Sequence, residues 1–222
     1  MDSWKRKCKI LNKEYIKKKI KIFDTPNFYY GYNYKNTYFY FKDLKGIYAA
    51  ERIKNILKIF DLNEIKEIGA GIGYSCFYLC QKIKKNYTLY DIPHASLLQA
   101  VFLLNSFGDN YVHLDNEPKN KKNKIFIKPY WKLLEDQHNK KTLWFNEDSL
   151  PEIDIETGKR YMDIIEKTPE SFFLSINQEA NNDYGYGIKQ HRVIDLIKNS
   201  KSLYRLRDFL RPGYIEELYK IK

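Results

Sequence analysis

Apolar residues recur at intervals of three and four between residues 46 and 60, which predicts one face of a helix. Further helices are predicted at residues 74–83, from Pro93 to a stop at Gly108, and near 156–166 and 188–198. Short apolar runs predict strands at residues 65–68, 87–90, 125–130, 143–145 and 172–176. Because strands and helices alternate, we expect an α/β fold with a parallel sheet that helices cover on both faces.

The chain closes with a different pattern. Apolar runs at residues 203–209 and 214–221 flank the turn Arg211-Pro212-Gly213. A pair of segments joined by so short a turn predicts an antiparallel edge on the sheet. Residues 116–124 are polar and rich in lysine, which predicts an exposed loop.

The first 45 residues differ from the rest in composition. Residues 1–22 place an apolar stripe between lysines, which predicts a basic amphipathic helix. Such a helix either packs its stripe onto the domain or lies on a membrane surface. Residues 23–45 are aromatic and irregular, and their rings either contact a substrate or bury one another. We therefore expect a helical and aromatic cap at 1–45 and a main domain at 46–222.

The strand at 65–68 runs into the turn Glu67-Ile68-Gly69-Ala70-Gly71-Ile72-Gly73. Closely spaced glycines permit positive φ and let a ligand approach backbone that a Cβ would shield. Asp91 follows Gly73 by eighteen positions and closes the next predicted strand. An acid at that place can accept hydrogen bonds from both ribose hydroxyls. The two features together predict a nucleotide-type cofactor site.

The register of the glycines separates two cofactor classes. A dinucleotide site has Gly-x-Gly-x-x-Gly, but Tyr74 stands at the third glycine position here and the pattern is Gly-x-Gly-x-Gly. With Glu67 before it, this pattern resembles that of class I S-adenosylmethionine (SAM) methyltransferases. The alternative is a glycine-rich turn in an unrelated α/β domain. The resemblance implies that SAM contacts Glu67, Gly69, Ala70, Gly71, Gly73, Asp91, Ile92 and Asn146.

The formal charge of +11 is unevenly spread along the chain. Residues 1–22 carry +7 of it, and the other two hundred residues carry the remaining +4. Lys, Ile, Asn and Tyr are all abundant, which an A/T-rich coding sequence produces without selection for a partner. We therefore expect no nucleic-acid partner, although a basic chain invites that interpretation.

The three cysteines, an odd and sparse number, favour a reducing compartment over a disulfide framework. Cys76 and Cys80 lie one helical turn apart, so we interpret them as core thiols and expect no metal site. The longest mainly apolar run, at residues 95–104, is too short to span a bilayer, and the N-terminus lacks the apolar core of a signal peptide. These features predict a cytoplasmic protein.

Five segments resemble the bacterial sugar O-methyltransferases over roughly residues 46–222. They are Glu67 to Gly73, Tyr90-Asp91-Ile92-Pro93, Asn146 to Glu152, Leu174-Ser175-Ile176-Asn177 and Phe209 to Glu217. The resemblance implies a seven-stranded Rossmann-like class I methyltransferase sheet, mostly parallel with an antiparallel C-terminal edge. It also implies transfer of a methyl group from SAM to a hydroxyl of a sugar or glycan precursor. The N-terminal part matches no motif of the family.

Methyl transfer to a hydroxyl needs in-line positioning, exclusion of water and a base that takes the proton. Ligands of open α/β sheets bind beyond the carboxyl ends of the strands. The residues expected around the methyl group are therefore Glu147, Asp148 and Glu152 after one strand, and Gln178 and Glu179 after another. We expect Glu152 to be the base, Asp148 to be the second candidate and His191 the third. The alternative for each acid is a helix N-terminal residue stabilised by the dipole, and for His191 an exposed helix position.

Two other interpretations stay open. A nucleic-acid or other small-molecule methyltransferase would share the fold, but base N-methylation typically places Asn or Asp before Pro-Pro-aromatic, where this chain has Asn146-Glu147-Asp148-Ser149. A non-catalytic SAM-binding domain could serve glycan assembly. If the acceptor is linked to a lipid, residues 1–22 could contact an anionic membrane surface. The sequence does not determine the oligomeric state.

Overall fold

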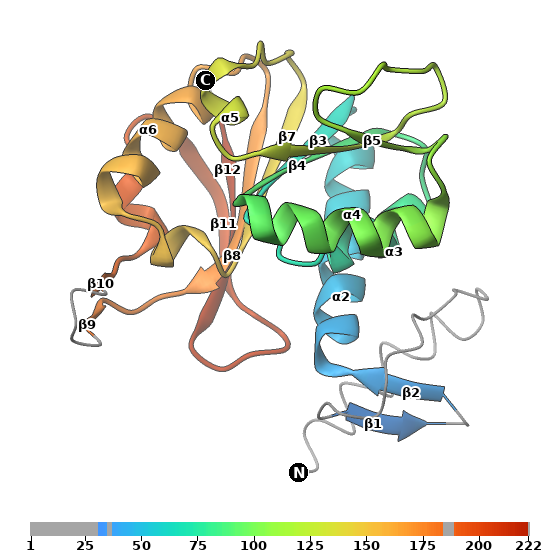
Figure 1. Ribbon diagram of the computed structural model, residues 1–222. Coiled ribbons are helices and arrows are strands. Elements are labelled where there is room, and N and C mark those ends of the chain that lie inside the picture. Colours follow the sequence, from blue (N-terminus) through green and yellow to red (C-terminus); the bar gives the residue numbers. More distant parts are fainter. Residues whose placement is uncertain (1–30, 35–36, 184–188, 222) are drawn as a thin grey trace.

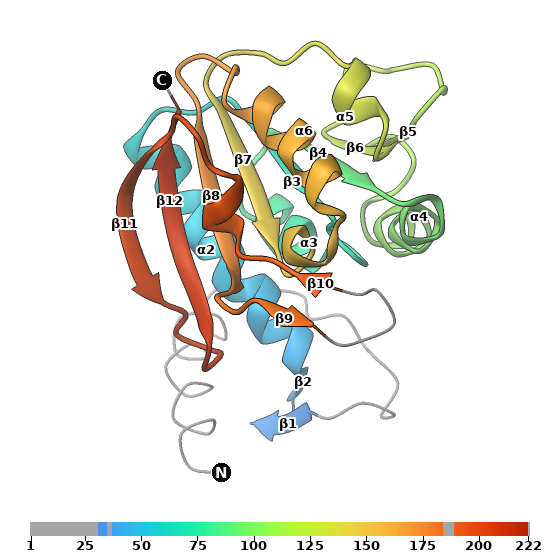
Figure 2. The ribbon, with the colours of Figure 1, turned by 90° about the vertical axis from the view of Figure 1, so that its left-hand side faces the viewer.

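A computed structural model describes residues 31–34, 37–183 and 189–221 of the 222-residue chain. In the described residues, one sheet has eight strands in the order β11-β12-β8-β7-β3-β4-β6-β5. Their bounds are β3 (Glu64–Ile68), β4 (Asn86–Asp91), β5 (Val112–Leu114), β6 (Ile125–Pro129), β7 (Thr142–Glu147), β8 (Phe172–Gln178), β11 (Lys201–Arg207) and β12 (Tyr214–Lys220). The strands from β5 to β8 pair in parallel, while β12 and β11 are antiparallel at one edge (Figure 2). The expected mostly parallel sheet with an antiparallel C-terminal edge is confirmed.

The sheet has one strand more than the seven that the resemblance implies. The additional strand is β5, which pairs in parallel with β6 at the opposite edge from β11. It has only three residues, so no hydrophobic alternation could reveal it in the sequence. Backbone N–H groups of Lys124 and Ile125 both donate to the carbonyl of Tyr111, which brings β5 beside β6.

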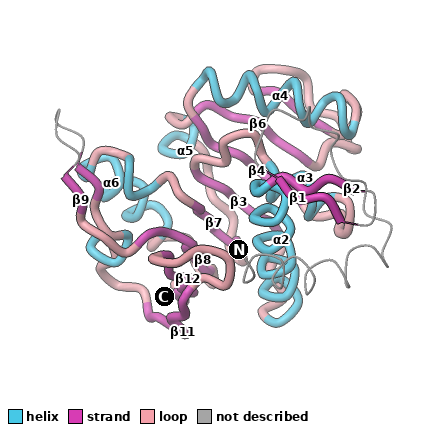
Figure 3. Tube along the Cα trace, turned by 90° about the horizontal axis from the view of Figure 1, so that it is seen from below, coloured by secondary structure: helices cyan, strands magenta, loops and turns pink. Residues whose placement is uncertain are grey.

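Helices cover both faces of the sheet (Figures 1 and 3). One face carries α2 (Phe41–Ile59), α3 (Tyr74–Cys80) and α4 (Pro93–Phe107), and the other carries α5 (Lys132–Glu135), α6 (Ile155–Ile165) and the 3₁₀ helices η1 (Leu150–Glu152) and η2 (Val193–Leu196). Alternate side chains of a strand point to opposite faces. Leu143 and Phe145 of β7 therefore join the core cluster of the first face, and Trp144 joins that of the second. No helix of the described segments combines the length and apolar character that crossing a membrane requires.

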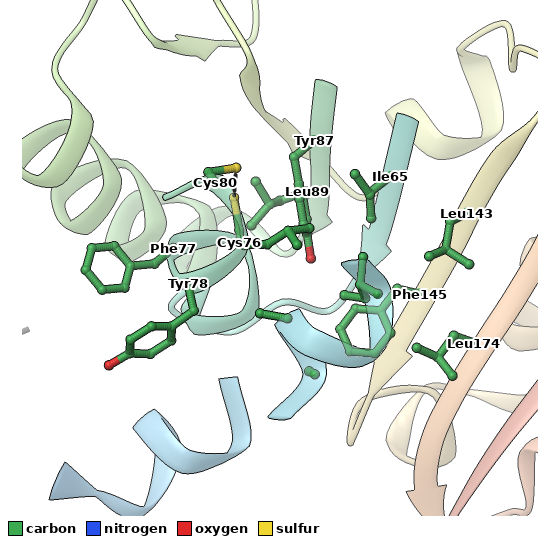
Figure 4. Close-up of a cluster of buried hydrophobic side chains, with 14 of the residues drawn as sticks. Ile65, Cys76, Phe77, Tyr78, Cys80, Tyr87, Leu89, Leu143, Phe145 and Leu174 are labelled. Carbon is green, nitrogen blue, oxygen red and sulfur yellow. Dashed lines mark hydrogen bonds between the residues drawn. The ribbon is translucent and has the colours of Figure 1, made fainter. Parts of the chain in front are cut away.

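The hydrophobic core cluster that packs against α2 and α3 holds α3 in place, the helix that begins directly after the glycine turn. Figure 4 shows Cys76 and Cys80 within this cluster, and their sulfur atoms lie 3.8 Å apart. Both are buried free thiols, which confirms their interpretation as core residues. A Cβ on Gly46 of α2 would lie 2.8 Å from the Cβ of Tyr74, so only glycine permits this approach of α2 to α3.

The structure differs from the sequence-based expectation before and within α2. Residues predicted to be irregular form a hairpin of β1 (Gly31–Tyr34) and β2 (Thr37–Tyr40), and α2 begins at Phe41. The expected domain boundary after residue 45 therefore falls inside a helix. The first turn of α2 was missed because polar residues interrupt the apolar pattern in it. One of them, Asp43, is nevertheless buried. It accepts hydrogen bonds from the backbone N–H of Tyr40 and the hydroxyl of Tyr78, both at 2.8 Å. The predicted helix at 1–22 lies outside the described residues.

The prediction of a helix at residues 188–198 is wrong. Strand β10 (Lys189–Gln190) pairs with β9 (Asn182–Asp183), and the short 3₁₀ helix η2 follows. Val193 and Leu196 are three residues apart and both buried, which suits the three residues per turn of a 3₁₀ helix. Tertiary packing of these two side chains therefore decides the local structure.

Candidate functional site

The glycine turn joins β3 to α3 at the carboxyl edge of the sheet. Gly69, Gly71 and Gly73 all have positive φ, at 65°, 60° and 92°. A Cβ on Gly69 would lie 2.0 Å from Oγ of Ser149, so the loop after β7 excludes any side chain there. A Cβ on Gly71 would have no neighbour within 4 Å, which leaves backbone open to a ligand. Gly73 instead faces Leu89 and Leu103 in the core.

Asp91 ends β4, and its carboxylate is bonded to the glycine turn. Its Oδ2 accepts hydrogen bonds from the N–H of Gly71 at 2.9 Å and from Nε2 of Gln99 at 2.8 Å. Its Oδ1 accepts from the N–H of Ile92 at 2.8 Å. A carboxylate has about four acceptor positions, so these bonds leave about one for a ligand rather than two. Burial raises the pKa of Asp91. Ile92 is exposed beside it.

A pocket of about 180 Å³ lies between the glycine turn, the first two turns of α2 and the end of β7. Of the residues proposed for the cofactor, Glu67, Gly69, Ala70 and Gly71 line it together. Its charged lining is completed by Lys42, Lys45, Glu147 and Asp148. Glu147 lies beside Asp148 as the sequence predicts, but the two lysines were not singled out, because nothing in the pattern shows that α2 reaches the glycine turn.

Glu67 is the buried acid of this pocket. Its carboxyl accepts a hydrogen bond of 2.7 Å from the hydroxyl of Tyr87. Burial raises the pKa of Glu67 to about 8, which the bond from Tyr87 only partly counteracts. Near neutral pH the carboxyl of Glu67 is therefore mostly protonated, and it ionises as the pH passes 8.

Asn146 lies at the end of β7 and is fully buried. Its Nδ2 donates to the carbonyl of Ile68 at 2.8 Å and to Oγ of Ser149 at 2.5 Å. Its Oδ1 accepts from the N–H of Leu150 at 3.3 Å and from Nδ2 of Asn177 at 2.9 Å. These bonds use the whole capacity of the amide. The side chain thus joins the ends of β3, β7 and β8, and Asn146 does not line the pocket.

A cluster of ion pairs surrounds the turn after β7. Arg211 donates to Oδ1 of Asp148 at 2.5 Å, to Oε1 of Glu147 at 2.9 Å and to Oδ2 of Asp208 at 3.0 Å. Lys45 of α2 binds Oδ2 of Asp148 from the other side and lies 3.7 Å from Glu147. Burial would raise the pKa of Asp148, but the charges of Lys45 and Arg211 outweigh it and lower that pKa.

The three residues proposed as the base occupy different surroundings. Asp148 carries the ion pairs just described and has a left-handed backbone, with φ of 71°. Glu152 lies on η1, is exposed, and accepts a hydrogen bond of 3.3 Å from Gln190. His191 is only 9% exposed, which contradicts the exposed helix position considered for it. Its Nε2 faces α6 near Gly158, and burial lowers its pKa.

In the part of the chain that the structure describes, no group of three or more His, Cys, Asp or Glu residues is arranged to hold a metal ion. The carboxylates, lysines and open backbone that line the pocket can recognise charged and hydroxyl groups.

No protein-family model and no curated protein sequence matches this chain. Solved structures do match its fold. The mitomycin 7-O-methyltransferase is 14% identical with a TM-score of 0.54, and the match covers 81% of this chain and 57% of that one. An O-methyltransferase family 2 protein from Planctomyces limnophilus, solved with apigenin, is 10% identical with a TM-score of 0.54, over 79% of this chain and 58% of that one.

A third match is the methyltransferase domain of a bacterial Hen1 protein, 10% identical with a TM-score of 0.51. That match covers 77% of this chain and 96% of the other. The chain spans little more than half the length of the first two structures. At such low identity the likeness is one of fold. The chain has the Rossmann-like fold of class I methyltransferases.

Proposed function

We propose that the protein is a SAM-dependent O-methyltransferase that acts on a hydroxyl of a sugar or glycan precursor. The observation that carries the proposal is the pocket in which the open backbone of Gly71 and the acid Glu67 meet, beside the Asp91 carboxylate. It lies at the carboxyl ends of β3, β4 and β7, where open α/β sheets bind their ligands. The sugar acceptor is supported by the resemblance of the segments at 146–152, 174–177 and 209–217.

The residues present fit SAM. Gly71 would leave room for the cofactor, and Asp91 retains about one acceptor position for a ribose hydroxyl. Glu67 and Glu147 offer carboxylates to the positive groups of the methionine part. When bound, SAM supplies an electrophilic methyl group. Ala70, Gly73, Ile92 and Asn146 would then act mainly by shaping the turn and the strand ends that surround it.

Glu152 is the base in this proposal. Its side chain is exposed at the carboxyl edge of the sheet, near Tyr214. Burial raises the pKa of Tyr214 to about 12, and the charge of Asp148 contributes more to this than that of Glu152. Asp148 is the second candidate, but two cations hold its charged form and weaken it as a proton acceptor. His191 is the third candidate. Its imidazole is buried against α6 and reaches an acceptor hydroxyl only if the segment that carries His191 moves.

A hydroxyl of another small molecule is the second candidate acceptor, since the matched structures include a mitomycin O-methyltransferase and a complex with apigenin. A nucleic-acid acceptor is disfavoured because Asn146-Glu147-Asp148-Ser149 stands where base N-methyltransferases typically have Asn or Asp before Pro-Pro-aromatic. A non-catalytic SAM-binding domain would keep the glycine turn and need no base.

Two measurements test the proposal. Calorimetry with S-adenosylhomocysteine should show binding, and Gly71→Val should abolish it because the side chain fills the open space at Gly71. Mass spectrometry should then show a mass gain of one methyl group when SAM is supplied with a panel of nucleotide sugars. Methylation of phenolic compounds alone would select the second acceptor class. Cofactor binding without any methylated product would favour the non-catalytic domain, and absence of binding would remove the proposal.

A further inference from the structure

Lys42 lies in the first turn of α2 and lines the pocket above the glycine turn. Lys45 follows three residues later and lies on the same side of the helix. The two lysines differ in their surroundings. Lys45 is bonded to Asp148 and lies near Glu147, whereas the described residues provide no hydrogen bond or ion pair to the amine of Lys42.

The other cations near the pocket are already neutralised. Arg211 is shared by Glu147, Asp148 and Asp208, and Lys45 by the first two of these acids. Among the described residues, Lys42 is thus the charged donor of this pocket that is not used by the protein itself. A lysine at such a place binds an anionic oxygen well, because charge-assisted hydrogen bonds are among the stronger ones.

We infer that Lys42 binds the carboxylate of the methionine part of SAM. The inference rests on the proposed function and adds to it the orientation of the cofactor. Of the charged groups of SAM, the sulfonium and the amine are positive and match Glu67 and Glu147, while the carboxylate is the one anion. Asp91 is bonded to the N–H of Gly71 but is not among the residues that line the pocket with Lys42, and it suits the ribose. The cofactor therefore extends from Asp91 towards the first turn of α2.

The helix adds to this arrangement. The N-terminal end of α2 carries a partial positive charge that favours an anion, and α2 with 19 residues is long enough to have one. Asp43 fixes this end through its bonds to Tyr40 and Tyr78. The backbone around Lys42 is consequently held by the two contacts of the neighbouring Asp43.

The test compares SAM with decarboxylated SAM, which lacks only the carboxylate. Calorimetry on the full chain should show that Lys42→Met weakens binding of SAM about tenfold or more and leaves binding of decarboxylated SAM unchanged. Lys42→Arg should restore most of the loss. The matched control is Lys58→Met, which removes the same charge from the last turn of α2, sixteen residues and about 24 Å away, and should change neither affinity.

Three results would overturn the inference. Equal affinity of Lys42→Met and Lys58→Met for SAM would exclude a contact with the cofactor. Equal weakening of both ligands by Lys42→Met would show that the residue shapes the pocket and does not recognise the carboxylate. A raised KM for the acceptor with unchanged SAM affinity would assign Lys42 to the acceptor. Failure of the proposed function gives a separate result, because the unmodified protein would then bind neither ligand.

Discussion

The carboxylate of Asp91 accepts a hydrogen bond of 2.9 Å from the backbone N–H of Gly71. The acid that closes β4 therefore holds the turn after β3, and Gln99 ties the two together by donating to both Oδ2 of Asp91 and the carbonyl of Gly71. A residue expected to bind the ribose thus also fixes the shape of the turn that faces it.

Asp91→Ala should weaken SAM binding by roughly ten- to a hundredfold, because hydrogen bonds to a charged partner contribute on the order of 1.5 to 3 kcal/mol. The loss should come with a lower melting temperature, since Gly71, Ile92 and Gln99 lose their shared acceptor. Calorimetry and thermal unfolding measure the two effects. Asp109→Ala removes an exposed acid after α4 and serves as the control. Unchanged SAM affinity in Asp91→Ala would contradict the cofactor assignment.

Gly69→Ala should destabilise the fold by at least about 2 kcal/mol, because it combines positive φ with a collision between the new Cβ and Ser149. Gly71→Ala meets no neighbour and should cost only about 1 kcal/mol, while it weakens cofactor binding. Urea unfolding separates the two variants. Adding Ser149→Gly to Gly69→Ala removes the colliding atoms and should recover part of the stability. If the double variant is no more stable than Gly69→Ala, the close approach does not explain the glycine.

Glu152→Gln should lower kcat by roughly 10²- to 10⁴-fold, the usual contribution of a base, with SAM affinity and melting temperature unchanged because the side chain is exposed. Asp148→Asn should instead lower stability by on the order of 1 kcal/mol, since Lys45 and Arg211 lose a charged partner that is itself 36% exposed. Steady-state kinetics beside thermal unfolding distinguish them. Full turnover in Glu152→Gln with loss in Asp148→Asn would reverse the two roles.

Stability should fall as the pH rises towards 8. Glu67 in the folded protein keeps its proton up to about 8, whereas an unfolded glutamate loses it near 4.5. The contribution of Glu67 is therefore complete below pH 4.5 and lost as the pH passes 8, with a slope of at most about 1.4 kcal/mol per pH unit. Asp43, with a pKa of about 6, acts in the same direction at lower pH.

Glu67→Gln should flatten the dependence between pH 6 and 8, which denaturant unfolding at several pH values will measure. Binding of the positively charged SAM should show the opposite trend and tighten over the same range as Glu67 becomes ionised. A slope that persists in Glu67→Gln would assign the titration to another group.

Residues 1–22, outside the described residues, lead to a prediction about membranes. If this segment is a basic amphipathic helix that contacts an anionic leaflet, each basic residue near the surface contributes about 1 kcal/mol. Sedimentation with anionic vesicles should then show binding that falls as salt rises and that disappears when 1–22 are deleted. Absence of binding by the intact protein, with a lower melting temperature after the deletion, would favour a helix packed on the domain.

The sequence predicts those parts of the structure that depend on local patterns. The strands β3, β4, β7 and β8 and the helix after Pro93 lie close to their expected positions, because each is a continuous apolar run or begins at a marked residue. The 3₁₀ helix η2 and the three-residue strand β5 were not predicted, since both depend on contacts with distant segments. Each of these elements has too few residues to show a hydrophobic period in the sequence.

The same distinction applies to the candidate site. The glycines and Asp91 are recognisable because the turn needs positive φ and the acid closes a strand. Lys42, Lys45 and Arg211 come from segments far away along the chain, and only the folded structure shows that they meet the end of β7. The burial of His191 was equally invisible, because a polar loop residue gives no sign of the helix it packs against.

The close packing of Gly46 against Tyr74 holds α2 firmly against α3. Helix α2 forms one wall of the pocket and also buries Ile47, Ala50 and Ile53 in the core. Swinging it outward would return these side chains to water, at about 1.5 to 3 kcal/mol for each of the two isoleucines. We therefore expect this wall to stay in place while a ligand enters or leaves, and expect the ligand to pass the open side at Gly71.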